Sequence, residues 1–182
     1  MRFWNLLCSY SKGAESDIAI ALSAISLGDL AMVVVMGQGG LLDVAVPPDY
    51  KHGDAETGWI YFTYVTPVQR EKESGLGATA LGRVKLNELL SALQDWQTLL
   101  VTKSASDGGR HFGSRIAFIG DYVFFGVGDR GNRSNGQDLT THAGTIMRLH
   151  RDGRLPVSVA EESRPSSKGV YSVYCARQSD CG

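Results

Sequence analysis

The sequence predicts an all-β fold, and three observations carry this prediction. From residue 39 onward, short runs rich in β-branched and aromatic residues alternate with polar or glycine-rich turns. The chain contains 22 glycines, a content that suits many tight turns. The runs are not separated by the amphipathic helices that parallel βαβ units would require. An antiparallel arrangement of strands is therefore expected.

Seven strands are predicted, at residues 41–46, 59–65, 78–86, 96–102, 115–119, 122–127 and 145–150. The stretch KLNELLSALQDW alone has a helical period, and it is short enough to be a strand end followed by a loop. The aromatic residues alternate as strand residues do, so we expect core packing rather than ligand binding for Tyr61, Phe62, Tyr64, Phe124 and Phe125.

A weak internal repeat predicts a more specific architecture. GQGGLLDVAVPPDY followed by WIYFTYV is similar to RHFGSRIAFIGDY followed by VFFGV. In this register Gln38 and His111 are equivalent, 73 residues apart. Repeated four-stranded units are typical of a β-propeller, in which corresponding loops converge on one end of a central channel. We therefore expect Gln38 and His111 to face the same axial site.

Composition argues against two classes of partner. The 182 residues carry a net charge of −1 without a block of like charges, so neither nucleic acid nor an anionic membrane surface is expected as a partner. The longest apolar stretch, residues 18–37, is interrupted by Gly28 and Asp29, so membrane insertion is not expected. Acidic residues before this stretch also argue against a secretory signal.

No metal site is predicted within this chain. Cys8, Cys175 and Cys181 lack C-x-x-C spacing, although a disulfide between Cys175 and Cys181 stays open for an oxidising compartment. The oxygen-rich loop at residues 128–142 invites a calcium interpretation, but its spacing does not match an EF-hand. A hydrogen-bonded turn is expected there. The glycines at 37–40 lead into a strand rather than a helix, which argues against a nucleotide site.

His111 is the first candidate for chemistry. A histidine that titrates near neutral pH can remove a proton from a substrate hydroxyl, and a carboxylate can hold its tautomer. Asp129 is the best-placed carboxylate, because a β-hairpin between the two residues would bring their loops together. The residue pattern leaves a second interpretation open, in which His111 only caps a turn beside Gly113.

Three motifs in order point to one family. They are GQGGLLDVAVPPDY, GRHFGSRIAF and FFGVGDRGNRSNGQDLTTHAGTIMRLHRDGRLP. This series resembles the soluble aldose sugar dehydrogenases that use pyrroloquinoline quinone (PQQ), the glucose/sorbosone dehydrogenase family, over residues 33–156. Residues 1–32 and 157–182 do not resemble it. The resemblance implies a six-bladed β-propeller, of which this truncated chain would hold about half.

The resemblance also implies roles for four residues. His111 matches the general base that removes the proton from the anomeric hydroxyl of an aldose, and Asp129 matches the carboxylate that supports this base. Gln38 lies where the family places a glutamine near the bound sugar. Arg177 matches an arginine that contacts the cofactor.

PQQ as hydride acceptor and calcium as a Lewis acid are the implied cofactors. The calcium ligands and further cations are expected in the missing part of the propeller. The resemblance implies a periplasmic location, and it leaves the electron acceptor unspecified.

The unmatched ends suggest a fragmentary reading of a longer gene. Open blade edges predict self-association. The alternative to an enzyme is a non-catalytic propeller fragment that serves as a binding or interaction module.

Overall fold

The computed structural model describes residues 33–70, 73–89 and 91–156. These ranges contain β1 (Leu41–Ala45), β2 (Ile60–Arg70), β3 (Glu73–Leu86), β4 (Leu93–Val101), β5 (Ile116–Ile119), β6 (Tyr122–Val127), the 3-10 helix η2 (Arg133–Gln137) and β7 (Thr145–His150). The all-β prediction is confirmed. Within the described ranges, no helix has the length and apolar character needed to cross a membrane.

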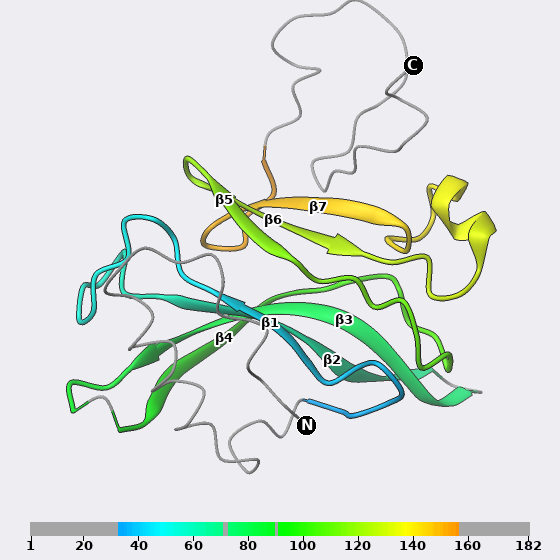
Figure 1. The fold of residues 1–182 in the computed structure, drawn as a ribbon, viewed down its shortest axis with the longest axis horizontal. Coiled ribbons are helices and arrows are strands. Elements are labelled where there is room, and N and C mark those ends of the chain that lie inside the picture. The colour runs from blue at the N-terminus through cyan, green and yellow to red at the C-terminus, as the bar shows by residue number, and fades with distance from the viewer. Residues whose placement is uncertain (1–32, 71–72, 90, 157–182) are drawn as a thin grey trace, which may run out of the picture.

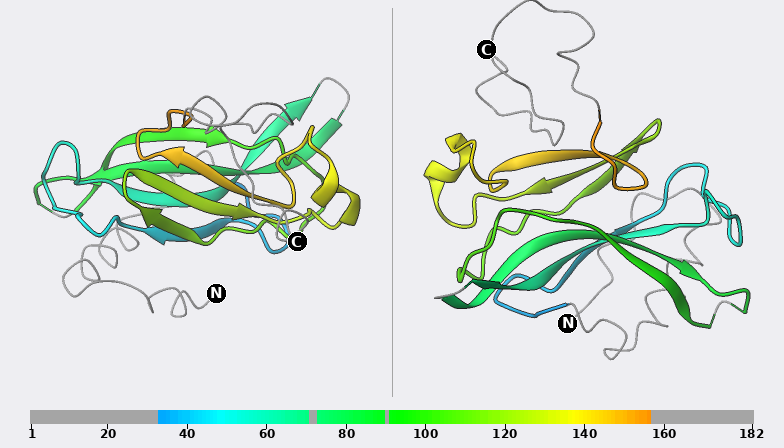
Figure 2. Two further views of the ribbon diagram at one scale, coloured as in Figure 1. Left: turned by 90° about the horizontal axis from the view of Figure 1, so that it is seen from above. Right: turned by 180° about the vertical axis from the view of Figure 1, so that it is seen from behind.

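The strands form two antiparallel sheets that pack face to face (Figures 1 and 2). One sheet has the order β1-β2-β3-β4 and the other has the order β5-β6-β7. Each predicted strand is present, and the helical period at KLNELLSALQDW is indeed the end of β3, a turn and the start of β4. Strand β2 ends later and strand β3 begins earlier than predicted. The two strands form a long hairpin in which Pro67 pairs with Gly77 and Val68 pairs with Leu76.

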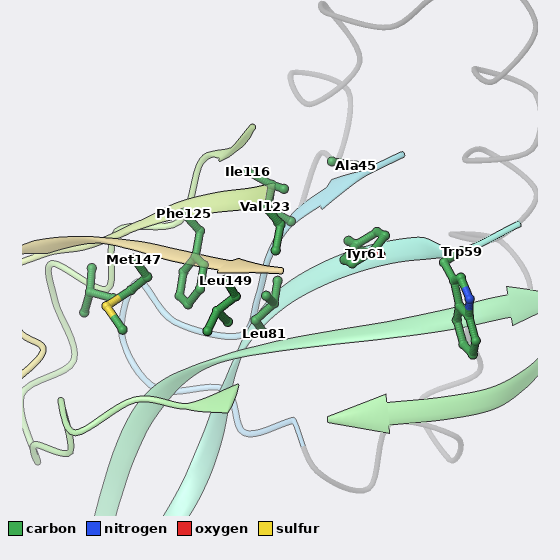
Figure 3. Close-up of a cluster of buried hydrophobic side chains, with 10 residues drawn as sticks. Ala45, Trp59, Tyr61, Leu81, Ile116, Val123, Phe125, Met147 and Leu149 are labelled. Carbon is green, nitrogen blue, oxygen red and sulfur yellow. The ribbon is translucent and has the colours of Figure 1, made fainter. Parts of the chain in front are cut away.

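A hydrophobic core joins the two sheets (Figure 3). Period-two alternation places every second residue of β6 in this core, while Tyr122 and Phe124 point to the other face. The core combines residues on the four-stranded sheet side with residues of the three-stranded sheet: Ala45, Trp59, Tyr61 and Leu81, with Ile116, Val123, Phe125, Val127, Met147 and Leu149.

The opposite face of the four-stranded sheet is apolar as well. Its buried residues are Val44, Val46, Ile60, Phe62, Tyr64, Ala80, Val84 and Leu86. This sheet therefore has two buried faces, which explains why β2 reads as an almost continuous apolar run. The core role predicted for the aromatic residues is confirmed for Tyr61, Phe62, Tyr64 and Phe125, each at most 1% exposed, whereas Phe124 is half-buried.

Buried hydroxyl groups of the four-stranded sheet hold the segment that leads from the β4–β5 loop into β5. Thr63 Oγ1 lies 2.6 Å from Ser114 Oγ and donates to the Ser114 carbonyl at 3.2 Å. Thr79 Oγ1 donates to the carbonyl of Phe112 at 2.8 Å. These bonds satisfy backbone groups that lie away from water. They fix residues 112–114 directly after His111.

Asp43 adds an ionisable contact to the same segment. Its Oδ2 accepts the backbone N–H of Ile116 at 2.8 Å, and the residue is only 4% exposed. Burial raises the pKa of the Asp43 carboxyl, against the opposing effects of the Ile116 N–H and the Arg115 charge. The folded state therefore binds the proton more tightly than the unfolded state. Protonated Asp43 therefore contributes to the stability of the folded state at low pH. This contribution is lost as pH rises through the raised pKa of the Asp43 carboxyl.

We expect Asp43→Asn to gain stability relative to the unmodified chain as pH rises from about 3 to 7, because asparagine keeps an acceptor for the Ile116 N–H but cannot ionise. Urea denaturation at several pH values measures the difference. Asp121→Asn, which alters an exposed residue, is the control. A variant that loses stability relative to the unmodified chain as pH rises would contradict the account.

Candidate active site

His111 lies in the loop between β4 and β5. Its φ is 55°, in the left-handed region that non-glycine residues seldom occupy. The backbone N–H of His111 donates to Gln38 Oε1 at 3.0 Å. Half of the side chain is exposed, 51%, so the imidazole is accessible from solvent.

Asp129 follows β6 and contacts the His111 ring. Its Oδ1 lies 2.6 Å from His111 Nδ1 and also accepts the backbone N–H of Gly131 at 2.8 Å. The hydrogen bond with His111, followed by that from Gly131, lowers the pKa of the Asp129 carboxyl. In neutral imidazole, a carboxylate at Nδ1 favours the proton on that nitrogen and leaves Nε2 as the acceptor. The predicted contact between the two side chains is confirmed.

The contact between His111 and Asp129 can form because the backbones of their two segments lie very close together. A Cβ atom added to Gly128 would lie 2.2 Å from the carbonyl oxygen of His111. Glycine at position 128 therefore allows the end of β6 to lie directly against the His111 backbone. Asp129, the next residue, then reaches the imidazole.

Gln38 joins the site from the turn before β1. Its backbone N–H donates to the carbonyl of Gly109 at 2.7 Å. A Cβ atom on Gly37, whose φ is 57°, would lie 2.1 Å from the same Gly109 oxygen, so the two turns are in direct contact. Gln38 and His111 are in contact, through the His111 backbone rather than its ring, and their position on the axis of a propeller stays a prediction.

The loop at residues 128–142 is a hydrogen-bonded structure, as predicted. Asn132 caps η2 by accepting the N–H of Ser134, and Asn135 Nδ2 donates to the Asp129 carbonyl at 2.9 Å. Among the described residues, no group of three or more His, Cys, Asp or Glu side chains could hold a metal ion. Arg177, Cys175 and Cys181 lie outside the described residues.

Arg130 is a feature of the site that sequence reasoning missed. It is 5% exposed, and its guanidinium donates to backbone carbonyls of the loop that carries His111. Charge patterning gives no signal for such a residue, because its acceptors are carbonyl groups rather than acidic side chains.

Comparison with known proteins decides the family. The family model described as "Glucose / Sorbosone dehydrogenase" matches residues 19–177, which is most of the chain. The chain belongs to the glucose/sorbosone dehydrogenase family. The matched range extends past residues 33–156 at both ends, and the division of the chain at these two positions stays a prediction.

Relatives of known name agree with this family assignment. The chain is 34% identical over 121 residues to aldose sugar dehydrogenase YliI of Escherichia coli, covering 66% of this chain and 30% of the relative. Quinoprotein glucose dehydrogenase B of Acinetobacter calcoaceticus is 27% identical over 158 residues, with 75% and 30% covered.

Solved structures of family members match the fold. The apo form of the E. coli aldose sugar dehydrogenase has a TM-score of 0.60 at 32% identity, covering 69% of this chain and 34% of that structure. The PQQ-bound aldose sugar dehydrogenase of Streptomyces coelicolor has a TM-score of 0.55 at 26% identity, with 70% and 35% covered. The chain thus spans about a third of the length of these relatives, less than the predicted half.

The described residues fit only part of the chemistry that the family name implies. His111 and Asp129 supply a proton acceptor, and Gln38 supplies an amide beside it. PQQ carries three carboxylates, whereas the cations near this pair are the exposed Arg110, which lies close to Gly131, and Arg130, whose buried guanidinium donates to backbone carbonyls. The described part of the chain also contains no group of three or more His, Cys, Asp or Glu side chains that could hold a metal ion. The described site therefore offers a proton acceptor, and its residues do not supply the groups that would hold the quinone or the metal.

Proposed function

We propose that this chain forms the proton-accepting part of the active site of a PQQ-dependent aldose sugar dehydrogenase. The single observation that carries the proposal is the 2.6 Å contact between His111 Nδ1 and Asp129 Oδ1, on a half-exposed imidazole. Family membership and the PQQ-bound relative support the reaction class. An aldose is the proposed substrate, and the periplasm is the proposed compartment.

His111 acts as the general base in this proposal. Asp129 holds the proton of neutral imidazole on Nδ1, so Nε2 accepts the proton of the anomeric hydroxyl. The imidazolium that forms lies beside the Asp129 carboxylate, which stabilises its charge. Because Oε1 of Gln38 accepts the His111 N–H, its amide NH₂ can donate to a sugar oxygen.

PQQ, when bound, would accept the hydride, and calcium would support that chemistry. The groups that hold both are proposed to lie in the two thirds of the family length that this chain does not span. The same proposal explains why the described site is accessible to solvent. In the intact protein, other blades would close over it.

A propeller is the architecture that we propose for the intact protein, with six blades as in the family. Two features of the four-stranded sheet support its role as one blade. Both of its faces are buried and apolar, as in a blade between two neighbours. The repeat also relates β1 and β2 to β5 and β6, which begin the three-stranded sheet packed on it. That sheet would be an incomplete second blade.

Self-association is expected of the isolated chain. Among the described strands, β7 pairs only with β6, and Ile146 on β7 is 47% exposed. An open edge with an exposed apolar residue pairs readily with another chain. The average mass in sedimentation velocity should therefore rise with concentration, and Ile146→Lys should reduce the rise. A monomer at every micromolar concentration would contradict this expectation.

A chimera tests the function itself. Residues 33–156 of this chain replace the corresponding segment of the E. coli relative, and the product is loaded with PQQ and calcium. We expect oxidation of glucose or another aldose that depends on His111. A folded chimera that binds PQQ and oxidises no aldose would instead favour the alternative, a non-catalytic interaction module.

A further inference from the structure

The side chain of Arg130 is a buried cation that joins the two segments of the site. Its Nη2 donates to the carbonyl of Gly108 at 2.8 Å, and its Nη1 donates to the carbonyl of Arg110. Weaker bonds at 3.3 and 3.4 Å run from Nε to the Ser104 carbonyl and from Nη2 to the Gly77 carbonyl. The planar fork of guanidinium suits this set of acceptors, because its donors point in fixed directions.

An aromatic ring also packs against the Arg130 guanidinium. The guanidinium carbon of Arg130 lies 3.4 Å from the centroid of the Phe112 ring. Such stacking offsets part of the cost of removing a cation from water. Burial lowers the pKa of Arg130 to about 10, which leaves the side chain charged at neutral pH.

The chain positions of these contacts matter for the proposed base. The Arg110 carbonyl belongs to the peptide group that begins His111, and Phe112 is the residue that follows His111. On the other segment, Arg130 directly follows Asp129. Arg130 thus contacts the backbone before His111 and the ring after it, while its own backbone directly follows that of Asp129.

Backbone geometry indicates that this arrangement needs support. His111 and Arg130 have φ values of 55° and 57°, both in the left-handed region. Residues in this region are conformationally strained and persist only where surrounding contacts hold them. The bonds of the Arg130 fork supply such contacts for the His111 loop.

We propose that Arg130 is a positioning residue that holds the loop of residues 104–112 so that His111 Nδ1 meets Asp129. The proposal rests on the proposed function for its catalytic meaning, but the geometry it describes can be measured without sugar or quinone. Arg130 does not contact reacting atoms in this account. It acts through His111 and Asp129.

The test uses the full chain and the tautomer of His111. Long-range ¹H–¹⁵N correlation spectra, recorded where the imidazole is neutral, distinguish a proton on Nδ1 from one on Nε2. His111→Ala assigns the signal among the four histidines. In the unmodified chain, we expect the proton mainly on Nδ1. In Arg130→Lys, which keeps the charge but loses the fork, the population of this tautomer should fall about twofold or more.

A matched control separates positioning from general stability. Arg83 also stacks on an aromatic ring, Trp59, and donates to a backbone carbonyl, that of Arg151, far from the site. Arg83→Lys should leave the His111 tautomer unchanged, even where it lowers the melting temperature. A folded Arg130→Lys chain with the unmodified tautomer population would overturn the proposal.

A second variant tests the proposal if Arg130→Lys does not fold. Phe112→Leu removes the stacked ring but keeps the guanidinium fork, so we expect a smaller shift in the same direction. An unchanged tautomer in a folded Phe112→Leu chain would then overturn the proposal. A tautomer shift in these variants, combined with a chimera that is active without His111, would support positioning by Arg130 while contradicting the proposed base.

Discussion

Replacing His111 by alanine in the chimera is expected to lower the rate of aldose oxidation by about 10²–10⁴-fold, the usual contribution of a general base. The loss should fall mainly on kcat, because the imidazole acts when the hydroxyl proton is transferred rather than when the sugar binds. Initial rates with an artificial electron acceptor, at saturating PQQ and calcium, measure the effect. Wild-type rates in the variant would contradict the assignment.

One further variant extends this prediction to Asp129, and another serves as its control. Asp129→Asn removes the charge that stabilises the imidazolium but leaves the base in place, so a loss smaller than that of His111→Ala is expected. His52→Ala is the control, because His52 contacts the Asn87 carbonyl and takes no part in the site. Equal losses for His52→Ala and His111→Ala would indicate damage to the fold instead of lost catalysis.

Truncating Phe125 to alanine should destabilise the chain by about 3–5 kcal/mol, the range for a large aromatic side chain in a core. Phe125 is 1% exposed, pairs with Ile116 across β5 and β6, and lies in the core between the sheets (Figure 3). The resulting cavity would remove packing contacts between the sheets on the strand that leads to Asp129. Urea denaturation measures the loss in free energy of unfolding.

Phe124→Ala is the matched control for this prediction. Phe124 precedes Phe125 on the same strand, is half-buried and faces away from the core. Its truncation removes the same atoms from a less enclosed position, so the loss should be clearly smaller. Equal losses for the two variants would contradict the described packing of the sheets.

Much of the fold could be predicted because turns and strands differ sharply in composition. The strands around Tyr61 and Phe125 are dense in aromatic and β-branched residues, and glycine-rich turns bound them. The end of the β2–β3 hairpin was underestimated. The sequence beyond Val65 is mixed in character, but backbone pairing continues as far as Arg70 and Glu73.

Side-chain pairs in the site were also within reach of sequence reasoning. His111 and Asp129 belong to two motifs of one family, and the internal repeat indicated that Gln38 lies near His111. Arg130, Asp43 and Thr63 were not predicted, because each bonds to backbone groups of a distant segment. No side-chain pattern in the sequence marks those acceptors, and they exist only once the sheets have packed.

The central proposal is that this chain holds the proton-accepting part of the site, while its described residues supply no place for the quinone. Titration of the purified chain with PQQ and calcium, followed by the absorbance of the quinone before and after an aldose is added, tests it most directly. We expect no saturable change at micromolar concentrations of the chain alone, whereas the chimera binds and reduces the quinone. Saturable binding and aldose-dependent reduction by the chain alone would contradict this division of the site.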